Sequence, residues 1–368
     1  WPGFFVLRKP NIFRDKLLQL MAILKHYQTG SNKYYVMGNK PLMKAVQFDR
    51  FGSASETLKQ TSLPIPEPKE DEVLVQLKTS GVNPSDVKKR NGAFPDLIHS
   101  GYIIPHSDGA GIIKSVGKRV DGSRIGERVF VYQAQHNRRF GTAAEYVALP
   151  SKRAAKLPDS VSFEVGACIG IPMMTAHRCV FSDGNVKNLN LLVTGGAGKV
   201  ACYAIQLAKF AGAQVFATAS NSHDANLCQN LGANHVFNHR EDGWGKEVVS
   251  AARDQKIDRI IDCEFGKNLS EVLDCVKTSG VIATYGSALV SAPPIPFKDM
   301  MFKDLTIRMV LVYDMPESAK SRAVGDIQKL LSENQLHHRL TTFPLEDVHK
   351  AHEMIERGGK GCVVLKID

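Results

Sequence analysis

Residues 190–210, NLLVTGGAGKVACYAIQLAKF, place a short apolar run, a glycine-rich turn and an amphipathic segment in direct succession. Leu191, Leu192 and Val193 form the kind of run that a parallel strand needs when both of its faces are covered. After the turn, apolar residues recur at helical spacing at positions 200, 204, 207, 208 and 211. The segment therefore predicts a strand, a tight turn and a helix, which together open a βαβ unit.

The turn fits G-x-G-x-x-A, a form of the dinucleotide-binding fingerprint, with Gly196, Gly198 and Ala201 at the fixed positions. In this interpretation Gly196 permits the tight turn, Gly198 lets the backbone approach a pyrophosphate, and Ala201 lets the helix lie close to the sheet. The diphosphate would lie at the positive end of the helix. Because glycine turns also serve purely structural ends, an ordinary strand-to-helix turn is the alternative.

The segments that follow favour the nucleotide interpretation. They read as alternating strands and helices: a strand within 211–220, a helix at 223–232, a strand at 235–238, a strand at 257–263, a helix at 268–278 and a strand at 279–287. This alternation predicts a doubly wound parallel sheet.

The end of the second strand bears on the choice of cofactor. NAD sites usually place Asp or Glu there, about 20 residues past the glycines, to hold the ribose 2′-hydroxyl. This chain has Thr218, Ala219 and Ser220 and no acidic residue before Asp224. A 2′-phosphate would meet no repulsion, so NADPH is favoured, although no Arg or Lys stands in that turn. Lys199 has two interpretations, a phosphate contact or a solvated lysine.

Length and composition limit the class of protein. The 368 residues suggest two domains, and the 43% hydrophobic and 23% charged content is typical of a soluble globular protein. No apolar stretch reaches the 18 residues of a membrane span, so we expect no membrane association. The seven cysteines are scattered, which indicates neither a disulfide framework nor a C-x-x-C pair but a reducing compartment, the cytoplasm.

The net charge of +10 is concentrated at the start of the chain, where residues 1–42 carry seven Lys or Arg and one acidic residue. Residues 43–368 are therefore much closer to neutral, which disfavours a dedicated nucleic-acid surface. Residues 12–27 could form a basic amphipathic helix. A mitochondrial presequence, a simple extension and a misassigned reading frame are the alternatives for this leader, and we expect the folded unit to begin at Met43.

The part of the chain before the fingerprint is mostly β. Proline-rich residues 63–71 separate its first two predicted strands, and the strands fall at 43–48, 71–82, 109–117, 127–132 and 144–150. Short strands at this spacing predict a compact, partly open barrel.

Several segments now occur in one order: GVNPSDVKKRNG (81–92), DGAGIIKSVG (108–117), GERVFVY (126–132), AEYV (144–147), IGIPMMTAHR (169–178), FNHRE (237–241), TYGS (284–287) and FPLEDVHKAHEMIERGGKGCVVL (343–365). They resemble the medium-chain dehydrogenase/reductase superfamily, specifically its zinc-free quinone reductase branch, over residues 43 to 368.

The resemblance implies an α/β fold in which a GroES-like β-barrel catalytic domain precedes a Rossmann domain that binds NADPH. Residues 1–42 would be an extension outside the fold, and 43–167 the barrel, completed by 309–368. Residues 168–308 would be the nucleotide-binding domain, with the active site in the cleft between the two domains.

The resemblance also implies cofactor contacts. Thr175 would lie near the nicotinamide, and Ser220 and His239 near the adenosine, with a plain surface histidine as the alternative for His239. The diphosphate would be wrapped by Gly196, Ala197, Gly198, Lys199 and Val200, and the rest framed by Asn268, Tyr285, Gly286, Ser287, Ala288, Val310, Leu311 and Val312.

On the substrate side the resemblance implies Asn83 and Asp86. Asn83 would donate a hydrogen bond to a quinone oxygen, or would only stabilise its own turn. Tyr132 is a further candidate, as a proton source, with simple packing as its alternative.

The same comparison argues against a catalytic zinc ion. Asn83 stands where the zinc enzymes of the superfamily have a cysteine ligand, and His106-Ser107-Asp108 does not reproduce their G-H-E motif. We therefore predict no metal and a hydrogen-bonded loop role for His106. Two departures from the family pattern concern the cofactor: the turn ends Lys199-Val200-Ala201 in place of consecutive glycines, and Lys88 replaces a tyrosine.

The sequence thus predicts a zinc-independent, NADPH-dependent quinone oxidoreductase for small quinones, which in this branch would release semiquinone by one-electron transfer. One alternative is an NADPH-dependent reductase of the C=C bond of alkenals and enones. Another is an NADPH-regulated RNA-binding or structural protein. The resemblance also implies a homodimer or homotetramer in which the strand at 304–312 pairs with its copy.

Overall fold

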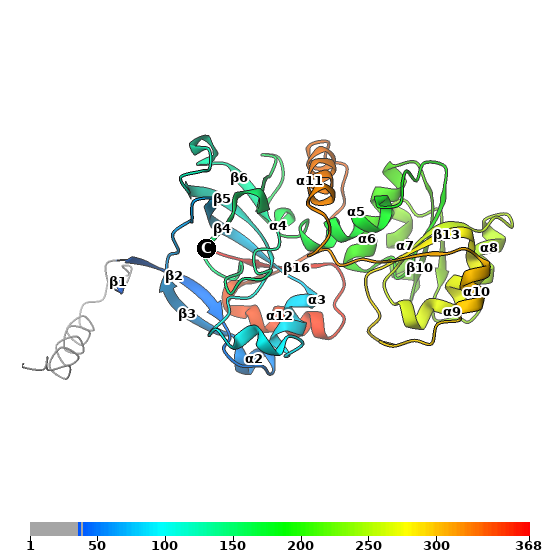
Figure 1. Cartoon of the computed structure of the whole chain (residues 1–368), viewed down its shortest axis with the longest axis horizontal. Helices are drawn as coiled ribbons and strands as arrows, with labels where there is room; N and C mark the ends of the chain where they lie inside the picture. The colour runs from blue at the N-terminus through cyan, green and yellow to red at the C-terminus, as the bar shows by residue number, and fades with distance from the viewer. Residues whose placement is uncertain (1–35, 38–39) are drawn as a thin grey trace, which may run out of the picture. The chain divides into compact units, whose positions relative to one another are not determined.

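The computed structural model describes residues 36–37 and 40–368, so the expected leader helix at 12–27 lies outside the described residues. The chain divides into two units, Trp1–Leu42 and Met43–Asp368. The second unit carries the strands and helices discussed below, except the strand Val36–Met37 and the first residues of the strand Lys40–Gln47 (Figure 1). No helix in the described part of the chain is long and apolar enough to cross a membrane.

The front part of this unit is built on a seven-stranded sheet. The strand order is β15-β16-β4-β5-β6-β8, with β7 also paired to β4. Its strands are β4 (Glu72–Val82), β5 (Asp108–Val116), β6 (Arg128–Val131), β7 (Tyr146–Pro150), β8 (Ala154–Lys156), β15 (Leu340–Pro344) and β16 (Cys362–Lys366). Two strands from the end of the chain therefore complete a sheet that begins near residue 72.

The long strand β4 holds this sheet together. It is antiparallel to β5, β7 and β16, and Val73, Val75 and Leu77 lie in the buried core beneath it. A second, three-stranded sheet has the order β1-β2-β3. Its strands are β1 (Val36–Met37), β2 (Lys40–Gln47) and β3 (Lys59–Pro64), and short helices α2 (Ala54–Thr57), α3 (Pro84–Arg90), α4 (Phe163–Gly166) and α12 (Val348–Glu356) accompany the two sheets.

The rest of the unit contains the predicted doubly wound sheet. Six strands lie in the order β11-β10-β9-β12-β13-β14, and every pair is parallel. They are β9 (Asn190–Val193), β10 (Gln214–Ala219), β11 (His235–Asn238), β12 (Ile257–Asp262), β13 (Val276–Thr284) and β14 (Thr306–Met309). The helices are α5 (Ile171–Phe181), α6 (Lys199–Phe210), α7 (Ser222–Asn230), α8 (Trp244–Ala251), α9 (Phe265–Cys275), α10 (Phe297–Phe302) and α11 (Glu317–Ser332).

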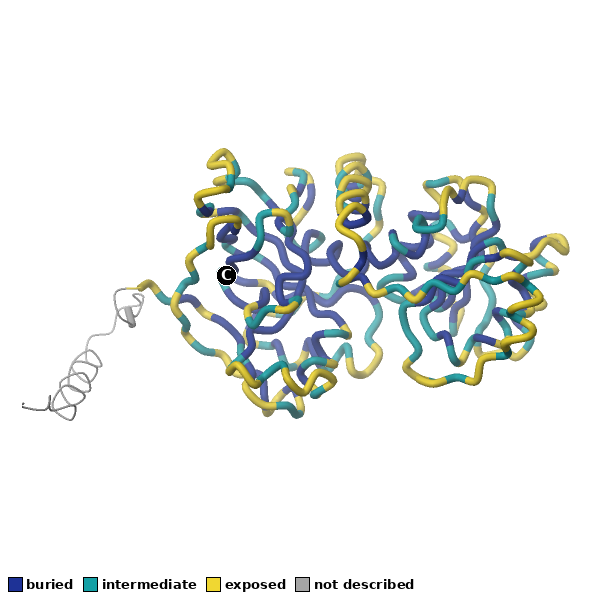
Figure 2. Tube along the Cα trace, in the orientation of Figure 1, coloured by how far each residue is buried: buried dark blue, intermediate teal, exposed yellow. Residues whose placement is uncertain are grey.

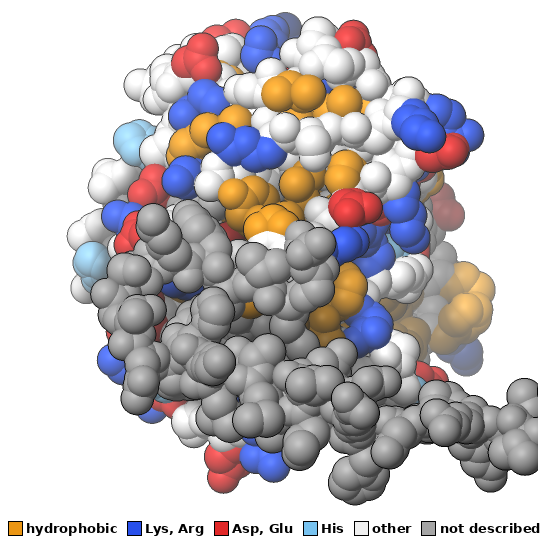
Figure 3. All heavy atoms as spheres, turned by 90° about the vertical axis from the view of Figure 1, so that its left-hand side faces the viewer, with side chains coloured by type: hydrophobic (Ala, Val, Ile, Leu, Met, Phe, Trp, Pro, Cys, Tyr) orange, Lys and Arg blue, Asp and Glu red, His pale blue; other side chains and the backbone are white. Residues whose placement is uncertain are grey.

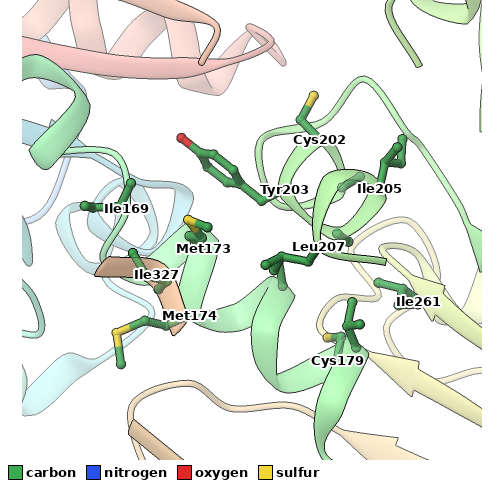
Figure 4. Packing of buried hydrophobic residues seen from close by; sticks show 14 of the residues in the cluster. Ile169, Met173, Met174, Cys179, Cys202, Tyr203, Ile205, Leu207, Ile261 and Ile327 are labelled. Carbon is green, nitrogen blue, oxygen red and sulfur yellow. The ribbon is translucent and has the colours of Figure 1, made fainter. Parts of the chain in front are cut away.

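Alternating residues of β9 explain why helices cover both faces. Leu191 and Val193 pack in one cluster with α5 and α6, whereas Leu192 packs in another with α8 and α9. Leu207 of α6, Cys179 of α5 and Ile261 of β12 belong to the first cluster (Figure 4). Strand β9, in the interior of the sheet, is accordingly buried from end to end, whereas the edge strands β11 and β14 are not (Figure 2). The α/β fold class predicted from the sequence is confirmed, while the domain boundaries at 167 and 308 stay predictions.

Several predicted boundaries were wrong, and the strand expected at 279–287 is β13, Val276–Thr284. The helix expected at 268–278 is α9, which ends at Cys275 because Val276 already pairs with Ile257 in the parallel ladder. The strand expected at 304–312 is only β14, Thr306–Met309. Beyond it the chain leaves the sheet for the barrel, where the Val312 carbonyl accepts a hydrogen bond from Gln133 Nε2 at 2.8 Å.

Candidate active site

The glycine turn differs in one detail from the prediction. The residue in the left-handed region is Gly195, with φ +59°, and not Gly196. Gly196 is required by packing instead, because a Cβ there would lie 2.5 Å from Cys228 Sγ and 3.1 Å from Ile205 Cδ1. Gly195 N donates to Thr218 Oγ1 at 2.9 Å, which ties the turn to the end of β10.

Gly198 is the N-cap of α6, and the helix begins at Lys199. A Cβ at Gly198 would meet only the Gly195 carbonyl oxygen, at 3.1 Å, so the turn is open on its outer side. Ala201 is fully buried, which lets α6 lie against the sheet. The first N–H groups of a helix have no partners within it, so this turn fits a cofactor diphosphate.

A groove of about 340 Å³ runs past this turn. It brings together five residues expected at the cofactor, namely Ala197, Gly198, Lys199, Ser220 and His239, and it adds Pro84, Gly195, Ala219, Asp224, Ile355, Gly358, Gly359, Lys360 and Gly361. The other predicted cofactor residues, among them Thr175, Val200 and Asn268, do not line it.

Lys360 is the groove residue that sequence reasoning missed. Its ammonium forms an ion pair with Asp224, and its Nζ lies 3.4 Å from Ser220 Oγ. Lys360 is 140 residues from Ser220 in the chain, so no local pattern joins the two. The available signal was the glycine-flanked lysine of GGKG before the last strand, where Gly358 and Gly361 have φ of +76° and +87°.

His239 lies behind the turn. Its Nδ1 is 3.1 Å from Thr218 Oγ1, the oxygen that also accepts from Gly195 N. Burial lowers the pKa of His239, so the imidazole is neutral at physiological pH.

Thr175 is buried on α5, and its hydroxyl donates to the Ile171 carbonyl at 2.6 Å.

The remaining predicted cofactor residues follow the carboxyl ends of neighbouring strands, the edge at which such sheets bind ligands. Asn268 Nδ2 donates to Asp262 Oδ1 at 2.8 Å. The turn that begins at Tyr285 and Gly286 is attached to the start of α9 by two hydrogen bonds. Ser287 Oγ accepts from Gly266 N at 2.9 Å. Ala288 N donates to Glu264 Oε2 at 2.8 Å. Leu311, which lies between Val310 and Val312, is exposed and lines a second cavity that is described below.

On the barrel side, Asn83 is the centre of a buried polar cluster. It is the N-cap of α3, and its backbone N–H donates to Asp86 Oδ2 at 2.8 Å. Its Nδ2 donates to Asp108 Oδ2 at 2.8 Å, and its Oδ1 lies 3.4 Å from Lys199 Nζ. Lys199 Nζ also donates to the Val82 carbonyl at 2.6 Å. Lys199 is therefore not a solvated lysine: it crosses from the glycine turn to the barrel.

Two carboxyl groups in this cluster have altered acidity. Burial raises the pKa of Asp86 to about 6, against the opposing charges of Lys89 and Lys199. Burial raises the pKa of Asp108 to about 8, although hydrogen bonds from Asn83 and the Ile171 N–H oppose the shift. Asp108 is therefore mostly protonated at neutral pH, a property that no sequence pattern indicated.

Two of the expected catalytic residues need correction. Asp86 is 1% exposed and its carboxylate caps its own helix, so it does not face an open substrate side. Tyr132 is 4% exposed, and its hydroxyl donates to the Lys152 carbonyl at 2.8 Å. Burial raises the pKa of Tyr132 to about 12. The hydroxyl is held by the backbone and is not available as the expected proton source.

His106 lies in the interior as a hydrogen-bonded residue. Its Nδ1 is 2.8 Å from Ser80 Oγ, and its Nε2 is 2.9 Å from His352 Nε2. Within the described ranges, no group of three or more His, Cys, Asp or Glu side chains is arranged to hold a metal ion.

A second cavity, of about 500 Å³, adjoins the Asn83 loop on the barrel side. It is lined by Ser85, Lys89, Phe94, Asp96, Leu97, Ser100, Gln135, His136, Asn137, Arg138, Arg139, Leu311, Tyr313 and Asp314. Consecutive residues that follow Asn83 at the start of α3 thus line both spaces, Pro84 the groove and Ser85 this cavity.

A larger hollow, of about 990 Å³, lies on the outside of the barrel around Arg119 and Arg124. Both arginines are already paired, Arg119 with Glu70 and Asp71, and Arg124 with Glu127. It contains none of the residues expected at the cofactor, and we assign no ligand to it.

Comparison with known proteins places this architecture in a family. Residues 69–159 match the model of the alcohol dehydrogenase GroES-like domain, and residues 200–331 match that of zinc-binding dehydrogenases. A quinone oxidoreductase of Lama guanicoe is 31% identical over 329 residues, covering 88% of this chain and 97% of that protein. A 2-methylene-furan-3-one reductase of Solanum lycopersicum is 30% identical over 55% of this chain and 53% of its own length.

Solved structures agree with the fold. An NAD-dependent alcohol dehydrogenase superposes with a TM-score of 0.78 at 28% identity, covering 89% of this chain and all of the other. A mycobacterial protein complexed with NADPH gives 0.77 at 25% identity, covering 88% and 100%.

The fold, the groove at the glycine turn and these matches define an NAD(P)H-dependent oxidoreductase. The chain belongs to the zinc-free quinone oxidoreductase branch of the medium-chain dehydrogenase/reductase superfamily.

The raised pKa of Asp108 yields a prediction for stability. The folded chain keeps this proton up to a pKa of about 8, whereas the unfolded chain loses it near pH ~4, so folding is progressively weakened as pH rises between these values. Asp108→Asn keeps an oxygen that can accept from Asn83 and removes the titration. Relative to wild type, the variant should gain at least about 1 kcal/mol between about pH 5 and pH 9, measured by urea unfolding.

Asp159→Asn is the matched control, because that carboxylate is 94% exposed. Its difference from wild type should not change with pH. An Asp108→Asn difference that is equally flat would contradict the assignment of a protonated, buried carboxyl.

Proposed function

We propose that this chain reduces small quinones with NADPH and without zinc. The observation that carries the proposal is the Asn83 loop, which borders the cofactor groove through Pro84 and the second cavity through Ser85. A nicotinamide and a flat substrate held in these two spaces would meet at the loop. Bound NADPH would supply two electrons and one hydrogen to the substrate.

The groove favours NADPH over NADH. A 2′-phosphate extending from the adenosine ribose past Ser220 would meet the Lys360 ammonium. The nearby acid, Asp224, does not oppose this because it is paired with Lys360 and accepts from Asn221 Nδ2 at 2.7 Å. NADPH is therefore the cofactor we propose.

The chain's own task in such a reaction is to hold the two rings together and exclude water. A quinone carbonyl is already electron-poor, so positioning and donors near the developing oxyanion supply the catalysis. Asn83 Nδ2 carries two hydrogens, and Asp108 accepts from this nitrogen. The other hydrogen is the group that we propose for a quinone oxygen.

The proposal for quinones has two forms: transfer of single electrons with release of semiquinone, as the branch implies, and transfer of both electrons to one quinone. Reduction of an enone C=C bond is the second candidate, supported by the likeness to the tomato furanone reductase. The RNA-binding or structural role has no comparable support. Basic and acidic side chains are mixed over the visible described surface in Figure 3, without a field of one sign.

A substrate panel tests the proposal directly. Purified protein with NADPH should oxidise the cofactor in the presence of small ortho- or para-quinones faster than with alkenals and enones, measured by the loss of absorbance of the reduced nicotinamide. Faster turnover of alkenals would favour the second candidate, and no turnover with either class would refute both.

Two substitutions test the cofactor choice. Lys360→Met should weaken NADPH binding about tenfold and leave NADH binding unchanged, because it removes one charge-assisted contact to the 2′-phosphate. Ser220→Asp should reverse the preference by repelling that phosphate. Cofactor titration by protein fluorescence gives both affinities, and a thermal melt shows that each variant is folded. Equal losses for NADPH and NADH in Lys360→Met would contradict this role.

We further propose a homodimer formed through the edge strand β14. The strand lies at one end of the six-stranded sheet, where no strand among the described residues pairs with its outer edge. The segments before and after it in the chain, and the strand itself, carry exposed apolar residues: Leu289, Phe297, Met301, Phe302, Met309 and Leu311. Such a patch beside an open strand edge suits a second copy of the chain.

Light scattering coupled to size-exclusion chromatography checks this arrangement. Wild type should have twice the mass of one chain or, if dimers pair, four times. Met309→Glu should shift it toward the monomer because it places a charge in the apolar contact. Phe210→Glu, on an exposed apolar residue of α6, is the control and should leave the mass unchanged. A monomeric wild type would refute the dimer.

We also propose a cytoplasmic location. All seven cysteines are free, which suits a reducing compartment. If the leader is a presequence, the mitochondrion is the alternative.

A further inference from the structure

The cavity beside the Asn83 loop contains a lysine that the sequence did not single out. Lys89 lies on α3, and its Nζ donates to Gln135 Oε1 at 2.5 Å and lies 5.3 Å from the centre of the Tyr313 ring. The Tyr313 hydroxyl is 2.9 Å from Ser85 Oγ. The ammonium and the phenol therefore form one wall of the cavity, next to the loop that borders the cofactor groove.

Lys89 is also a cation of this cavity that no carboxylate pairs among the described residues. Arg138 pairs with Glu72 at 2.8 Å, and His136 lies 3.3 Å from Asp314. The guanidinium of Arg139 lies over the rings of Tyr102 and Phe140. Among the residues that the structure describes, Lys89 has no carboxylate within ion-pairing distance, and its ammonium donates a hydrogen bond to the neutral amide of Gln135.

Its surroundings also suit release of a proton. Burial lowers the pKa of Lys89, and the nearby Asp86 and Asp108 oppose this only in part. An ammonium group with a lowered pKa is a better general acid near neutral pH than a solvated lysine. Phe94, Leu97 and Leu311 give the cavity apolar walls for a flat ring.

We propose that Lys89 is a catalytic residue that contacts the carbonyl oxygen of the substrate and gives it a proton. The inference rests on the proposed quinone reductase function and applies to its two-electron form. The quinone receives two electrons and one hydrogen from NADPH and becomes a hydroquinone monoanion. One N–H bond of Lys89 then breaks as an O–H bond forms on that oxygen, and the neutral amine recovers a proton from water. Each turnover consumes one NADPH, one quinone and one proton.

Two substitutions distinguish the contribution of the positive charge of Lys89 from that of the proton it would donate. Lys89→Met removes both and should lower kcat for a small para-quinone about 100-fold. Lys89→Arg keeps the charge but cannot release a proton near neutral pH, so it should keep KM near the wild-type value with a similarly lowered kcat. Lys114→Met is the matched control, because it removes an exposed charge from β5 of the same barrel and Lys114 lines neither cavity.

The pH profile is the readout that a merely structural role would not move. In wild type and Lys114→Met, kcat should fall as pH rises through the lowered pKa of Lys89, because the amine then has no proton to give. This alkaline limb should be absent from both Lys89 variants. A Lys89→Met enzyme with wild-type kcat, a limb that persists in it, or full kcat in Lys89→Arg would overturn proton donation by Lys89.

Failure of this inference is distinguishable from failure of the proposed function. If wild type binds NADPH but reduces no quinone, the proposed function fails. If wild type is active and the Lys89 variants behave like it, only the role of Lys89 fails. NADPH affinity, measured by fluorescence, and the thermal melt should be unchanged in all three variants, which excludes a loss of folding or of the cofactor groove as the cause.

Discussion

The pairing of β16 with β4 is the constraint on which the candidate site depends. Val363 lies opposite Val82 in this antiparallel ladder. Asn83 directly follows Val82, and the GGKG segment directly precedes the β16 residues. This register therefore places Asn83 and the GGKG segment, which are far apart in the sequence, at the same edge of the sheet, beside the glycine turn. A slip of one residue would turn the paired side chains to the other face and displace both loops.

Lys199 forms a hydrogen bond across that edge, between the glycine turn and the end of β4. The lysine begins α6, yet its Nζ donates to the Val82 carbonyl, the last residue of β4. The start of the nucleotide-binding helix and the end of a barrel strand are thus joined by one side chain. This contact also places a positive charge near the buried carboxyl groups of Asp86 and Asp108. The residue that departs from the family's glycine pattern has a structural task that glycine could not perform.

Local pattern was enough to predict the nucleotide-binding sheet. The run at 191–193 and the helical spacing after it are properties of neighbouring residues, and β9 and α6 follow them. The site was harder to predict, because its parts meet only through tertiary pairing. Lys360 joins Ser220 across 140 positions, and Tyr313 joins Ser85 across 228. Even within the fingerprint, the sequence could not show that Gly195 makes the turn. Nor could it show that Gly196 must be glycine because a Cβ there would collide with Cys228 Sγ.

The burial of Asp108 has a consequence for how this site can vary. One oxygen of its carboxyl group lies where a Cβ at Gly170 would have to be, and the other accepts the Ile171 N–H. The Asp108 carboxyl group and any side chain at position 170 would therefore occupy the same space. Any side chain at 170 requires a smaller residue at 108, and a smaller residue at 108 leaves a void that an alanine at 170 could fill. A side chain at 170 is therefore possible only together with a smaller residue at 108, so exchanging a loop that brings one to position 170 would require exchanging position 108 with it.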